Sequence, residues 1–540
     1  QGDGMPLGLL RTQDGTAADR VTLPPALQRL HVALFGRTGS GKSVALTNLI
    51  LENTTATDGA DIVLDPKGDG MPIEYLRSHY AVHGDLDGVY YFDCTELLPA
   101  LSFFDIRDQL ESGIDRSTAV EDVVDHYIEV LVGIMGHERF YRAVRSPDII
   151  RYLVKALFDP VHGSDAFTHR DLQQAVDRMH GTRDAPPVTD EDLQTMLGGV
   201  AANSERSFHE LMQGVANRIE KVPAYDRLGQ LFNHVPEESE DEGDGDADDD
   251  PHFDLRELLD EDAVILIDTS GLRPENRRGV TMVLLSALWT ALRRRAREAD
   301  DASGRPDKSV QRPVSGDGGT VAAPAESVEW SDRQDEPVEQ DGADGDVPLV
   351  NLYLEEAAEY ATSDLLAELL SQGRGFGLSM TLAMQFPGQL EEESSRAYSE
   401  VLNNVGTVLT GNVAVDSALT TRLATEDMPP SEVGNRLRAL SRGEWLASVP
   451  APFDETPPRP FVLESLPLPP GHPEGAEPLS AAREDAFKGL LEVVHDRTRK
   501  EYGLEVGTTD EQADETAGER RSGPSTRLSD TTERVDTTLP

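Results

Sequence analysis

Residues 36–43 have the sequence GRTGSGKS, whose residue types and spacing are suited to holding phosphate groups. The stretch fits the pattern G-x-x-x-x-G-K-[ST], in which glycines allow backbone N–H groups to turn toward phosphate oxygens. Lys42 is placed to reach the β- and γ-phosphates of a nucleotide, and the Ser43 hydroxyl to ligate Mg²⁺. The predicted cofactors are therefore ATP and Mg²⁺. The predicted nucleotide-binding residues are Gly36, Arg37, Thr38, Gly39, Ser40, Gly41, Lys42 and Ser43.

Hydrolysis of a bound nucleotide also needs carboxylates, one near the Mg²⁺ ion and one to orient the attacking water. Three apolar segments end in an acidic residue that could serve the metal, namely Asp65, Asp268 and Glu355. Asp268 fits the usual pattern best, because four aliphatic residues precede it, but no second carboxylate follows. Glu355 is followed directly by Glu356, so the first can ligate the metal and the second can position water. The same two acids are also compatible with the first turn of a solvated helix.

Asp268 also begins the sequence DTSG, which fits the D-x-x-G of a GTPase switch. The guanine-reading pattern N-K-x-D occurs nowhere in the sequence. The sequence therefore favours an ATPase over a GTPase.

The candidate residues lie at the ends of short apolar segments that alternate with helical stretches. Such segments are typical of a mainly parallel sheet with helices on both faces. Because the first segment leads into the phosphate-binding loop and then a helix, we predict an α/β fold of the RecA-like P-loop type. The predicted strands span residues 30–35, 60–65, 88–93, 263–268, 350–355, 378–385 and 406–411.

A different pattern occupies residues 105–232, where no strand is evident. Between 117 and 136 apolar residues recur at i, i+3 and i+4, as on one buried helix face, so we predict an inserted all-helical domain. The acidic runs 237–251 and 300–346 and the end of the chain are predicted to be disordered. The predicted organisation is an N-terminal segment 1–28, an ATPase domain in two parts (29–104 and 255–465) around the helical domain 105–232, an acidic linker 233–254, and a Pro-rich linker, one helix and a tail over 466–540.

The chain carries a net charge of −50, with 42 arginines but only seven lysines. Acidic residues occur throughout, which favours a halophilic, archaeal source over an ordinary protein with acidic tails. The single cysteine, Cys94, excludes intrachain disulfides and multi-cysteine zinc sites. The longest apolar run, 280–292, is too short to span a membrane, so we expect a cytoplasmic protein. Because the sequence begins at Gln1, the alternative in which an upstream segment anchors the protein at the inner face of the membrane stays open.

Four sequence elements together resemble the TraG- and TraD-like coupling ATPases of type IV secretion and conjugation, within the HerA and FtsK group of ring-shaped DNA translocases. They are FGRTGSGKS (35–43), IVLDPKGDG (62–70), LYLEEAAE (352–359) and SQGRGFGLSMTLAMQFPGQL (371–390). The resemblance covers residues 29–104 and 255–465. It implies a homohexamer that moves DNA or nucleoprotein with ATP and without sequence preference. It also implies relaxase or secretion-channel proteins as partners, and membrane contact only through a segment outside this chain.

The resemblance also assigns roles to single residues. Glu355 occupies the position at which these proteins usually have Asp, and Glu356 becomes the catalytic carboxylate. Arg374 resembles the arginine that reaches the γ-phosphate bound by a neighbouring subunit, and Gln385 resembles the polar sensor at the end of its strand. With Lys42 these four form the predicted catalytic set. An arginine paired with surface acids and a buried amide satisfied by backbone groups remain the alternatives for Arg374 and Gln385.

Two other functions stay open. A HerA-type motor for DNA-end processing has the same fold, although a small β-barrel is expected before its phosphate-binding loop. A nucleotide-binding scaffold with weak hydrolysis also fits, because Glu355 is one methylene longer than Asp and Mg²⁺ demands tight geometry. The net charge opposes DNA binding. A DNA pore would need local clusters such as Arg277 with Arg278, or Arg293–Arg295, which could instead pair with nearby acids.

Overall fold

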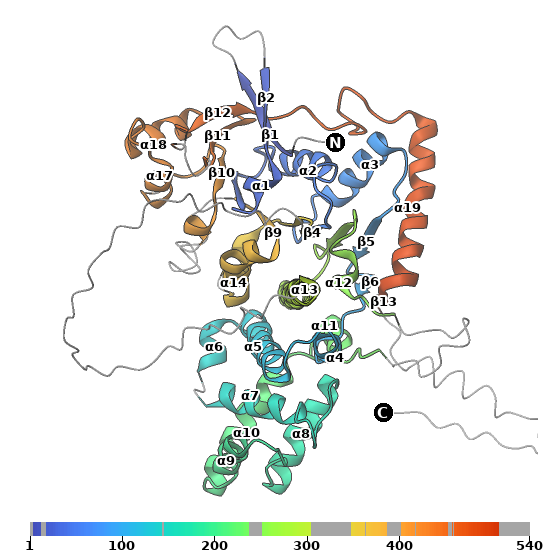
Figure 1. Cartoon of the computed structure of the whole chain (residues 1–540), viewed down its shortest axis with the longest axis vertical. Coiled ribbons are helices and arrows are strands. Elements are labelled where there is room, and N and C mark those ends of the chain that lie inside the picture. Colours follow the sequence, from blue (N-terminus) through green and yellow to red (C-terminus); the bar gives the residue numbers. More distant parts are fainter. Residues whose placement is uncertain are drawn as a thin grey trace, which may run out of the picture.

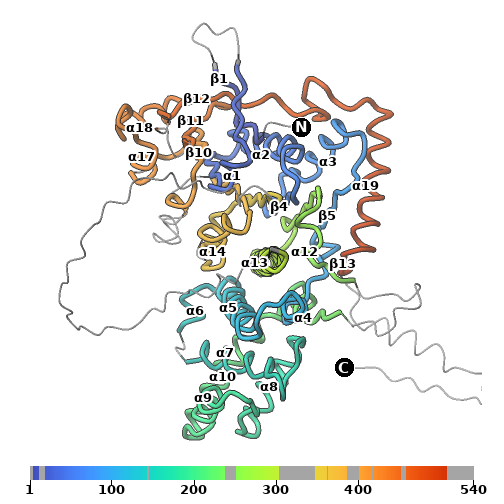
Figure 2. The backbone as a smooth tube through the Cα atoms, viewed as in Figure 1, coloured from blue at the N-terminus to red at the C-terminus, as the bar shows by residue number. Residues whose placement is uncertain are grey.

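The computed structural model describes residues 4–11, 18–142, 145–236, 251–303, 347–361, 363–385, 401–415, 417–451, 456 and 458–506. A large sheet occupies the upper half of Figure 1, with a helical insertion below it and the long helix α13 (Pro274–Ser303) between the two. The C-terminal helix α19 (Ala481–Tyr502) runs along one side of the molecule. Figure 2 shows that β1 and β12 meet at the end of the molecule opposite the insertion.

Seven parallel strands form one part of an eleven-stranded sheet within these ranges. Each segment that the sequence predicts as a strand forms one of them. Because most of their side chains are buried on both faces, these segments lack the alternation of a half-exposed strand. In spatial order the strands are β10 (Thr407–Thr410), β3 (Val32–Phe35), β9 (Leu378–Met384), β8 (Val350–Leu354), β4 (Asp61–Asp65), β7 (Val264–Asp268) and β5 (Val89–Asp93).

The order of these strands identifies the fold. β3, which leads into the phosphate-binding loop, lies between β10 and β9, and β9 separates it from β8. This is the strand order of RecA-like P-loop ATPases, so the predicted α/β fold is confirmed. Because the strands are parallel, their carboxyl ends bring Phe35, Asp65, Leu354 and Met384 to the same edge of the sheet.

Four antiparallel strands extend the sheet beyond β10, and the sequence does not predict them. Segment 1–28 contributes a hairpin that pairs with β12. Gly8 interrupts the apolar pattern of this hairpin at a bulge, where a Cβ atom would lie 2.6 Å from the carbonyl oxygen of Glu464. The four strands are β11 (Glu444–Ser448), β12 (Phe461–Glu464), β1 (Met5–Arg11) and β2 (Ala18–Leu23).

Helices cover both faces of the sheet. α2 (Lys42–Asn53), α3 (Met71–His83) and α19 share a hydrophobic core with one face, and α13 and α14 (Asp364–Gln372) share the other with the insertion. The remaining elements of the ATPase domain are α1 (Pro25–Gln28), β6 (Leu97–Pro99), α12 (Leu255–Leu258), the 3-10 helices η1 (Ala357–Tyr360) and η2 (Gly373–Phe376), α17 (Ser417–Leu423), α18 (Pro430–Ala439) and β13 (Gly503–Glu505).

The insertion is helical throughout its described residues, as the sequence predicts. Its longest helix, α5, packs along α13 and joins the insertion to the sheet. The helices of the insertion are α4 (Arg107–Glu111), α5 (Arg116–Met135), α6 (His137–Tyr141), α7 (Ser146–Leu157), α8 (His169–Thr182), α9 (Glu191–Ala201), α10 (Glu205–Ile219) and α11 (Asp226–Phe232).

Four of the five arginines of α13 that the sequence offers as pore candidates form ion pairs, and the fifth, Arg278, forms none with the described residues. The pairs help to fix α13 against the insertion and the ATPase domain, so these guanidinium groups are already engaged. The interpretation in which they pair with nearby acids is therefore favoured. The pairs are Arg277 with Glu359, Arg293 with Asp122, Arg294 with Asp254 and Arg295 with Asp260.

The predicted disordered segments fall largely outside the described residues. This holds for most of 237–251, most of 300–346 and the end of the chain, although α13 continues to Ser303. The helix predicted near 480–502 forms as α19. No helix in the described ranges is both long and apolar enough to cross a bilayer.

α19 covers the outer edge of the sheet at β5. The hydroxyl of Thr498 accepts from the backbone N–H of Tyr91 at 3.2 Å, and the guanidinium of Arg497 donates to the carbonyl of Val89. These contacts satisfy backbone groups that an edge strand otherwise leaves free to pair with another chain.

Candidate nucleotide-hydrolysis site

The phosphate-binding loop connects β3 to α2 at the carboxyl edge of the sheet. Gly39 and Gly41 have left-handed backbones, with φ angles of 76° and 95°, which favour glycine. At Gly36 a Cβ atom would lie 2.5 Å from Oγ of Ser40. α2 begins at Lys42 without a side-chain cap, so the backbone N–H groups of its first turn can bind an anion. The outer part of the loop, from Arg37 to Gly39, is exposed.

Lys42 and Gln385 converge on one carboxylate oxygen of Glu356. The ammonium nitrogen of Lys42 lies 3.5 Å from Oε1 of Glu356, and the side-chain amide of Gln385 donates to the same oxygen at 3.3 Å. Lys42 is only 4% exposed. The structure thus brings together three predicted catalytic residues from different elements. The contact with a carboxylate argues against the alternative in which backbone groups alone satisfy the amide of Gln385.

Glu356 has a strained backbone directly after β8. Its φ and ψ angles are 48° and 40°, a left-handed conformation that costs a non-glycine residue about 1–3 kcal/mol. In a continued strand, Glu355 and Glu356 would point to opposite faces of the sheet. The left-handed residue ends the strand, so that both carboxylates lie beside the phosphate-binding loop.

Glu355 is fully buried beside Ser43. Its Oε1 atom lies 3.5 Å from the Ser43 hydroxyl oxygen. Burial raises the pKa of Glu355 to about 7, while the nearby ammonium of Lys67 acts in the opposite direction. Oε2 of Glu355 has no hydrogen-bond partner in the described part of the chain. This carboxylate therefore has a free buried oxygen that faces the predicted metal position.

The loop after β4 supplies two residues that the sequence-based site omits. Lys67 donates to the Ser43 hydroxyl at 2.9 Å, pairs with Asp69 and lies 4.0 Å from Oε1 of Glu355. The Ser43 hydroxyl lies 2.6 Å from Asp69 and can donate to it. Burial alone would lower the pKa of Lys67, but the Asp69 and Glu355 carboxylates raise it above its usual value. The signal for both residues is the DPKGD element, which belongs to one of the four stretches that carry the family resemblance.

The acidic side chains around Ser43 fit a divalent cation. One carboxylate oxygen each of Asp65, Asp69 and Glu355 lie within 4.8 Å of one another. Oδ2 of Asp65, like Oε2 of Glu355, is buried without a partner among the described residues. A set of oxygen donors alone suits a hard ion such as Mg²⁺. The residues present therefore fit Mg²⁺, and the ammonium of Lys67 lies beside the same oxygens.

Asp268, the best match to the metal-side pattern, lies away from the phosphate-binding loop. Its strand β7 is on the far side of β4 from β8. The Asp268 carboxylate accepts from the backbone N–H of Ser270 at 2.9 Å and from the hydroxyl of Tyr91 at 3.4 Å. It thus stabilises the turn after its own strand, and Glu355 is the strand-end acid in contact with Ser43.

Arg374 is exposed on the 3-10 helix η2. Its guanidinium forms no ion pair or hydrogen bond with any other residue that the structure describes. This argues against the alternative in which Arg374 pairs with surface acids. Its side chain is available to a group outside the described chain.

Two buried residues hold the turn that carries Arg374. Nδ1 of His31 accepts from the backbone N–H of Met380 at 3.1 Å, so Nε2 carries the proton and donates to the carbonyl of Leu370 at 2.9 Å. Arg295 donates to a backbone carbonyl of the turn at 3.0 Å. The two ends of the turn are therefore tied to β3 and to α13.

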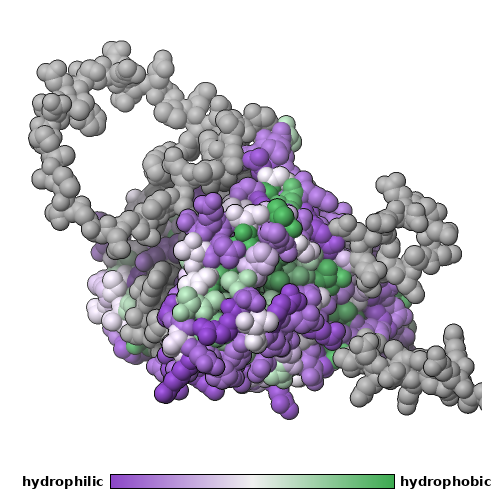
Figure 3. Space-filling model, turned by 90° about the horizontal axis from the view of Figure 1, so that it is seen from below, coloured by the Kyte–Doolittle hydropathy of each residue, from purple (hydrophilic) through white to green (hydrophobic). Residues whose placement is uncertain are grey.

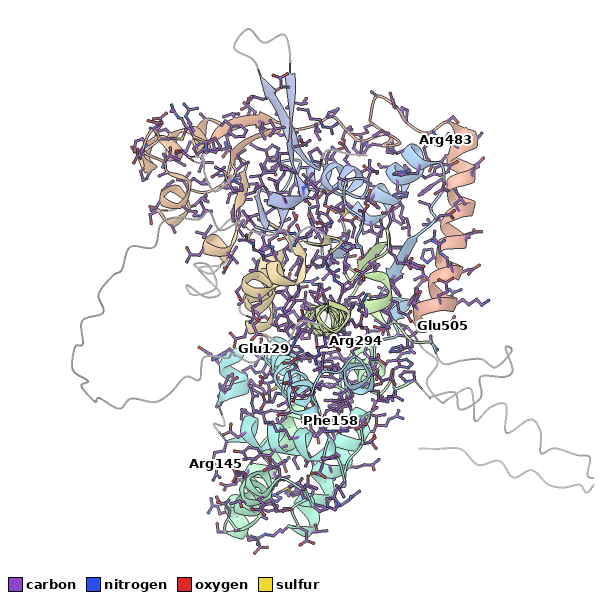
Figure 4. All side chains as sticks on the ribbon, in the orientation of Figure 1. Glu129, Arg145, Phe158, Arg294, Arg483 and Glu505 are labelled. Carbon is purple, nitrogen blue, oxygen red and sulfur yellow. The ribbon has the colours of Figure 1, made fainter. Side chains whose placement is uncertain are left out.

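α14 connects this turn to the helical insertion. Glu129 of α5, labelled in Figure 4, accepts from the backbone N–H of Asp364 at the first residue of α14. The last residue of α14, Gln372, directly precedes the turn with Arg374. A displacement of α5 can therefore be transmitted to Arg374 through one short helix.

A family model described as "Helicase HerA, central domain" matches residues 9–83. This range contains β3, the phosphate-binding loop, α2, β4, the DPKGD element and α3. Residues 9–83 are HerA-like.

Around this HerA-like region, most of the chain is similar to solved structures of the plasmid coupling protein TrwB and of VirB4. The plasmid coupling protein TrwB in complex with a non-hydrolysable ATP analogue is 15% identical, with a TM-score of 0.47, and the alignment covers 85% of this chain and 91% of TrwB. TrwB in complex with ADP and Mg²⁺ is 14% identical, with a TM-score of 0.44 and coverages of 83% and 88%. VirB4 of Thermoanaerobacter pseudethanolicus is 13% identical, with a TM-score of 0.46 and coverages of 86% and 97%. No curated protein matches the sequence significantly.

Proposed function

We propose that this chain is an ATP-driven motor similar to the coupling proteins of conjugative type IV secretion, which acts as a hexameric ring and pumps DNA or nucleoprotein. The observation that carries the proposal is the meeting of Lys42 and Ser43 with Glu355, Glu356 and Gln385 at one edge of the sheet. Two acids of a solvated helix start would not contact a phosphate-binding loop. The HerA-like region 9–83 supports a motor that acts on DNA.

In the proposed mechanism, ATP binds with its phosphates against the loop 36–43 and the first turn of α2. Lys42 moves from Glu356 to the β- and γ-phosphates. Ser43 and Glu355 would hold Mg²⁺, which neutralises charge on the phosphate oxygens when it is bound. Lys67, which donates to Ser43 in this structure, then loses that contact and keeps Asp69 as its partner.

Glu356 orients the attacking water in this mechanism. Departure of Lys42 toward the phosphates leaves Gln385 as the described donor to Oε1 of Glu356. The carboxylate is then held by β9 and can accept a hydrogen bond from water. Gln385 thereby links the state of the nucleotide to the strand that follows the arginine turn.

Arg374 completes the site of a neighbouring subunit. Its exposure and its lack of a described partner support a contact across a subunit interface. A guanidinium that reaches the transferred phosphate stabilises transition-state charge and is worth about 10³–10⁵ in turnover in P-loop NTPases. Hydrolysis would then require assembly of the ring.

The proposed substrate is DNA gripped by its phosphates without sequence preference. Relaxase or secretion-channel proteins would be the partners of a coupling motor. We place the motor in the cytoplasm, at the inner face of the membrane if a further segment anchors it.

The test is ATP turnover with and without DNA in multimolar KCl, combined with the mass of the assembly. We expect a ring-sized assembly whose turnover rises with DNA, and loss of turnover in Lys42→Ala. Unchanged turnover in Lys42→Ala would overturn the ATPase assignment. A monomer that responds to neither nucleotide nor DNA would favour the scaffold.

A HerA-type motor that processes DNA ends is the second candidate, and the match of residues 9–83 favours it. The two motors differ in their need for a DNA end. Equal stimulation by circular and linear DNA supports the coupling motor. Stimulation by linear DNA alone supports the end-processing motor.

A further inference from the structure

The short helix α6 and the residues around it carry three exposed arginines that form no ion pair within the described residues. Arg139 lies within α6, Arg142 follows its last residue, and Arg145 precedes α7. We call these three residues the arginine ridge. None of them forms an ion pair or a hydrogen bond with another residue in the described part of the chain. Figure 4 places Arg145 at the periphery of the insertion.

The ridge concentrates positive charge in a chain whose net charge is −50. Other arginines of the insertion are paired, for example Arg116 with Asp165 and Arg151 with Asp125. Seen from the insertion end, the surface is mainly hydrophilic with small hydrophobic areas (Figure 3). Exposed arginines without an ion pair among the described residues also occur elsewhere, as at Arg170, Arg178 and Arg442, but the ridge places three of them within seven residues of the chain.

α6 is held in place by a buried arginine beneath it. Arg218 of α10 is 6% exposed, and it donates twice to the carbonyl of Phe140, at 2.9 and 2.6 Å. The guanidinium also lies over the Phe140 ring, 5.6 Å from its centroid. Phe140 itself is fully buried. These contacts fix one face of α6 in the core, so that its arginines and its tyrosine lie on the outer face.

Aromatic rings accompany the arginine ridge. Tyr141 is 39% exposed, which is high for a large hydrophobic residue, and its ring lies 4.7 Å from that of His137. The one acid of α6 is Glu138. Arginines interleaved with exposed rings match the way proteins bind single-stranded nucleic acid, with charge along the backbone and rings stacked on bases.

The ridge continues onto the ATPase domain. Burial and the carboxylate of Glu275 raise the pKa of Tyr225, and Arg139 and Arg273 both act in the opposite direction. Arg139 of the insertion and Arg273, which precedes α13, therefore lie near the same tyrosine. Arg273 is exposed and likewise has no ion pair among the described residues. It follows β7 on the same edge of the sheet as the nucleotide site.

We propose that the arginine ridge, with Tyr141, is a contact surface for single-stranded DNA at the junction of the insertion and the ATPase domain. Three guanidinium groups bind successive backbone phosphates, and Tyr141 stacks on a base. An acidic protein partner would pair with the three arginines but would not account for the exposed ring of Tyr141. The choice of DNA as the polymer rests on the proposed function.

The experiment compares binding of fluorescein-labelled oligo(dT) and of a duplex of the same length by the full chain, over a range of KCl concentrations. The test variant combines Arg139→Gln, Arg142→Gln and Arg145→Gln. The matched control combines Arg170→Gln, Arg178→Gln and Arg442→Gln, which remove the same charge from exposed arginines elsewhere. A separate variant, Tyr141→Ala, tests stacking. ATP turnover without DNA shows whether each variant is folded.

We expect the ridge variant to bind oligo(dT) roughly tenfold more weakly or worse, with the slope of log K against log salt reduced by about 2, as for three lost single-strand phosphate contacts. The control should bind like the wild type, and turnover without DNA should be unchanged in both. Tyr141→Ala should weaken oligo(dT) binding more than duplex binding.

If the ridge variant binds oligo(dT) as tightly as the wild type does, the arginine ridge is not a DNA contact surface. The proposed motor function is not affected by that result. Equal losses in ridge and control variants would also overturn the contact surface, because overall charge would then explain the effect. An unchanged affinity in Tyr141→Ala would overturn the stacking contact. A wild type that neither binds DNA nor responds to it in turnover would overturn the proposed function together with the surface.

Discussion

Gln385 donates its side-chain amide to Oε1 of Glu356 at 3.3 Å, and this is the same oxygen that the ammonium of Lys42 approaches to 3.5 Å. One donor comes from the phosphate-binding loop and the other from the end of β9. A γ-phosphate that attracts Lys42 therefore removes one of two donors from Glu356. In the proposed mechanism the position of this carboxylate therefore depends on the nucleotide, which gives the first prediction.

Glu356→Gln should bind nucleotide with nearly unchanged affinity and lose about 10²–10⁴ in turnover, because an amide of the same size cannot act as the base that orients water. Gln385→Ala should lower turnover by a smaller factor. Steady-state hydrolysis and binding of a fluorescent ATP analogue check both. Turnover in Glu356→Gln within a factor of two of wild type would show that another group positions the water.

Glu355→Asp should lower turnover, although the proteins that the sequence resembles usually have Asp at this position. β8 is paired on both sides, and the backbone N–H of Glu355 donates to Leu64 at 3.1 Å, so the backbone cannot follow the shorter side chain. The carboxylate retreats by about 1.5 Å, and misplacement by about 1 Å can cost 10²-fold. The measurement is kcat at saturating MgATP. If the variant has the kcat of the wild type, Glu355 contacts the metal through a bound water molecule whose position can adjust to the shorter side chain.

Lys67→Met should lower the Mg²⁺ concentration needed for half-maximal turnover. The Lys67 ammonium lies among oxygens of Ser43, Asp69 and Glu355, and its removal leaves their negative charge to the metal. Asp69→Asn should change the requirement in the opposite direction. Mg²⁺ titrations of ATP turnover measure both.

Lys155→Met is the matched control for the change at Lys67, because Lys155 pairs with Glu121 on the insertion at 3.6 Å. Its Mg²⁺ requirement should equal that of the wild type. If Lys67→Met behaves in the same way, Lys67 has no part in the metal site.

Arg374→Ala and Lys42→Ala should each be nearly inactive but should recover turnover when mixed. In a mixed ring, the intact loop of an Arg374→Ala subunit can meet the intact arginine of a Lys42→Ala neighbour. Hydrolysis measured against the mixing ratio tests this. Turnover of the mixture equal to the sum of its parts would exclude an arginine that acts across the interface. Arg442→Ala, another exposed arginine, provides the control mixture.

Asp61→Asn should make stability less dependent on pH. Burial raises the pKa of Asp61 from 3.8 to about 8, so folding takes up a proton between these values. The stability of the wild type then falls by up to about 1.4 kcal/mol per pH unit as pH rises from 3.8 toward 8. Asparagine stays neutral and still accepts from the hydroxyl of Tyr353, as Asp61 does at 3.1 Å.

Urea midpoints at several pH values, in constant KCl, check the prediction for Asp61. The stability of Asp61→Asn relative to that of the wild type should increase as the pH increases. Parallel curves for the two proteins would show that Asp61 does not change its protonation on folding. Asp148→Asn, at an exposed acid of α7, should leave the pH dependence unchanged.

The sequence predicts the parallel half of the sheet and not the antiparallel half. Strands such as VILID (264–268) are uninterrupted apolar runs, because both of their faces are buried. β11 has the sequence EWLAS and β12 has only four residues, FVLE. Such short mixed segments become strands through their neighbours, which a local pattern does not contain.

The residues of the nucleotide site are likewise predicted only in part from the sequence. Lys42, Ser43, Glu355, Glu356 and Gln385 are predicted from motifs and do meet in the structure. Lys67 and Asp69 join them because β4 lies directly beside β8, and that adjacency is absent from the order of residues along the chain. Asp268 has the better local pattern, but β7 lies one strand too far from the loop.

The position of β3 in the sheet has a consequence for biosynthesis. β3 leaves the ribosome long before its two neighbours, β9 and β10, and before the edge-covering helix α19. During translation the apolar strand that carries the phosphate-binding loop therefore has two open edges and is at risk of pairing with other nascent chains. The proposed hydrolysis site can form only after Gln385, the last of its residues along the chain, has left the ribosome.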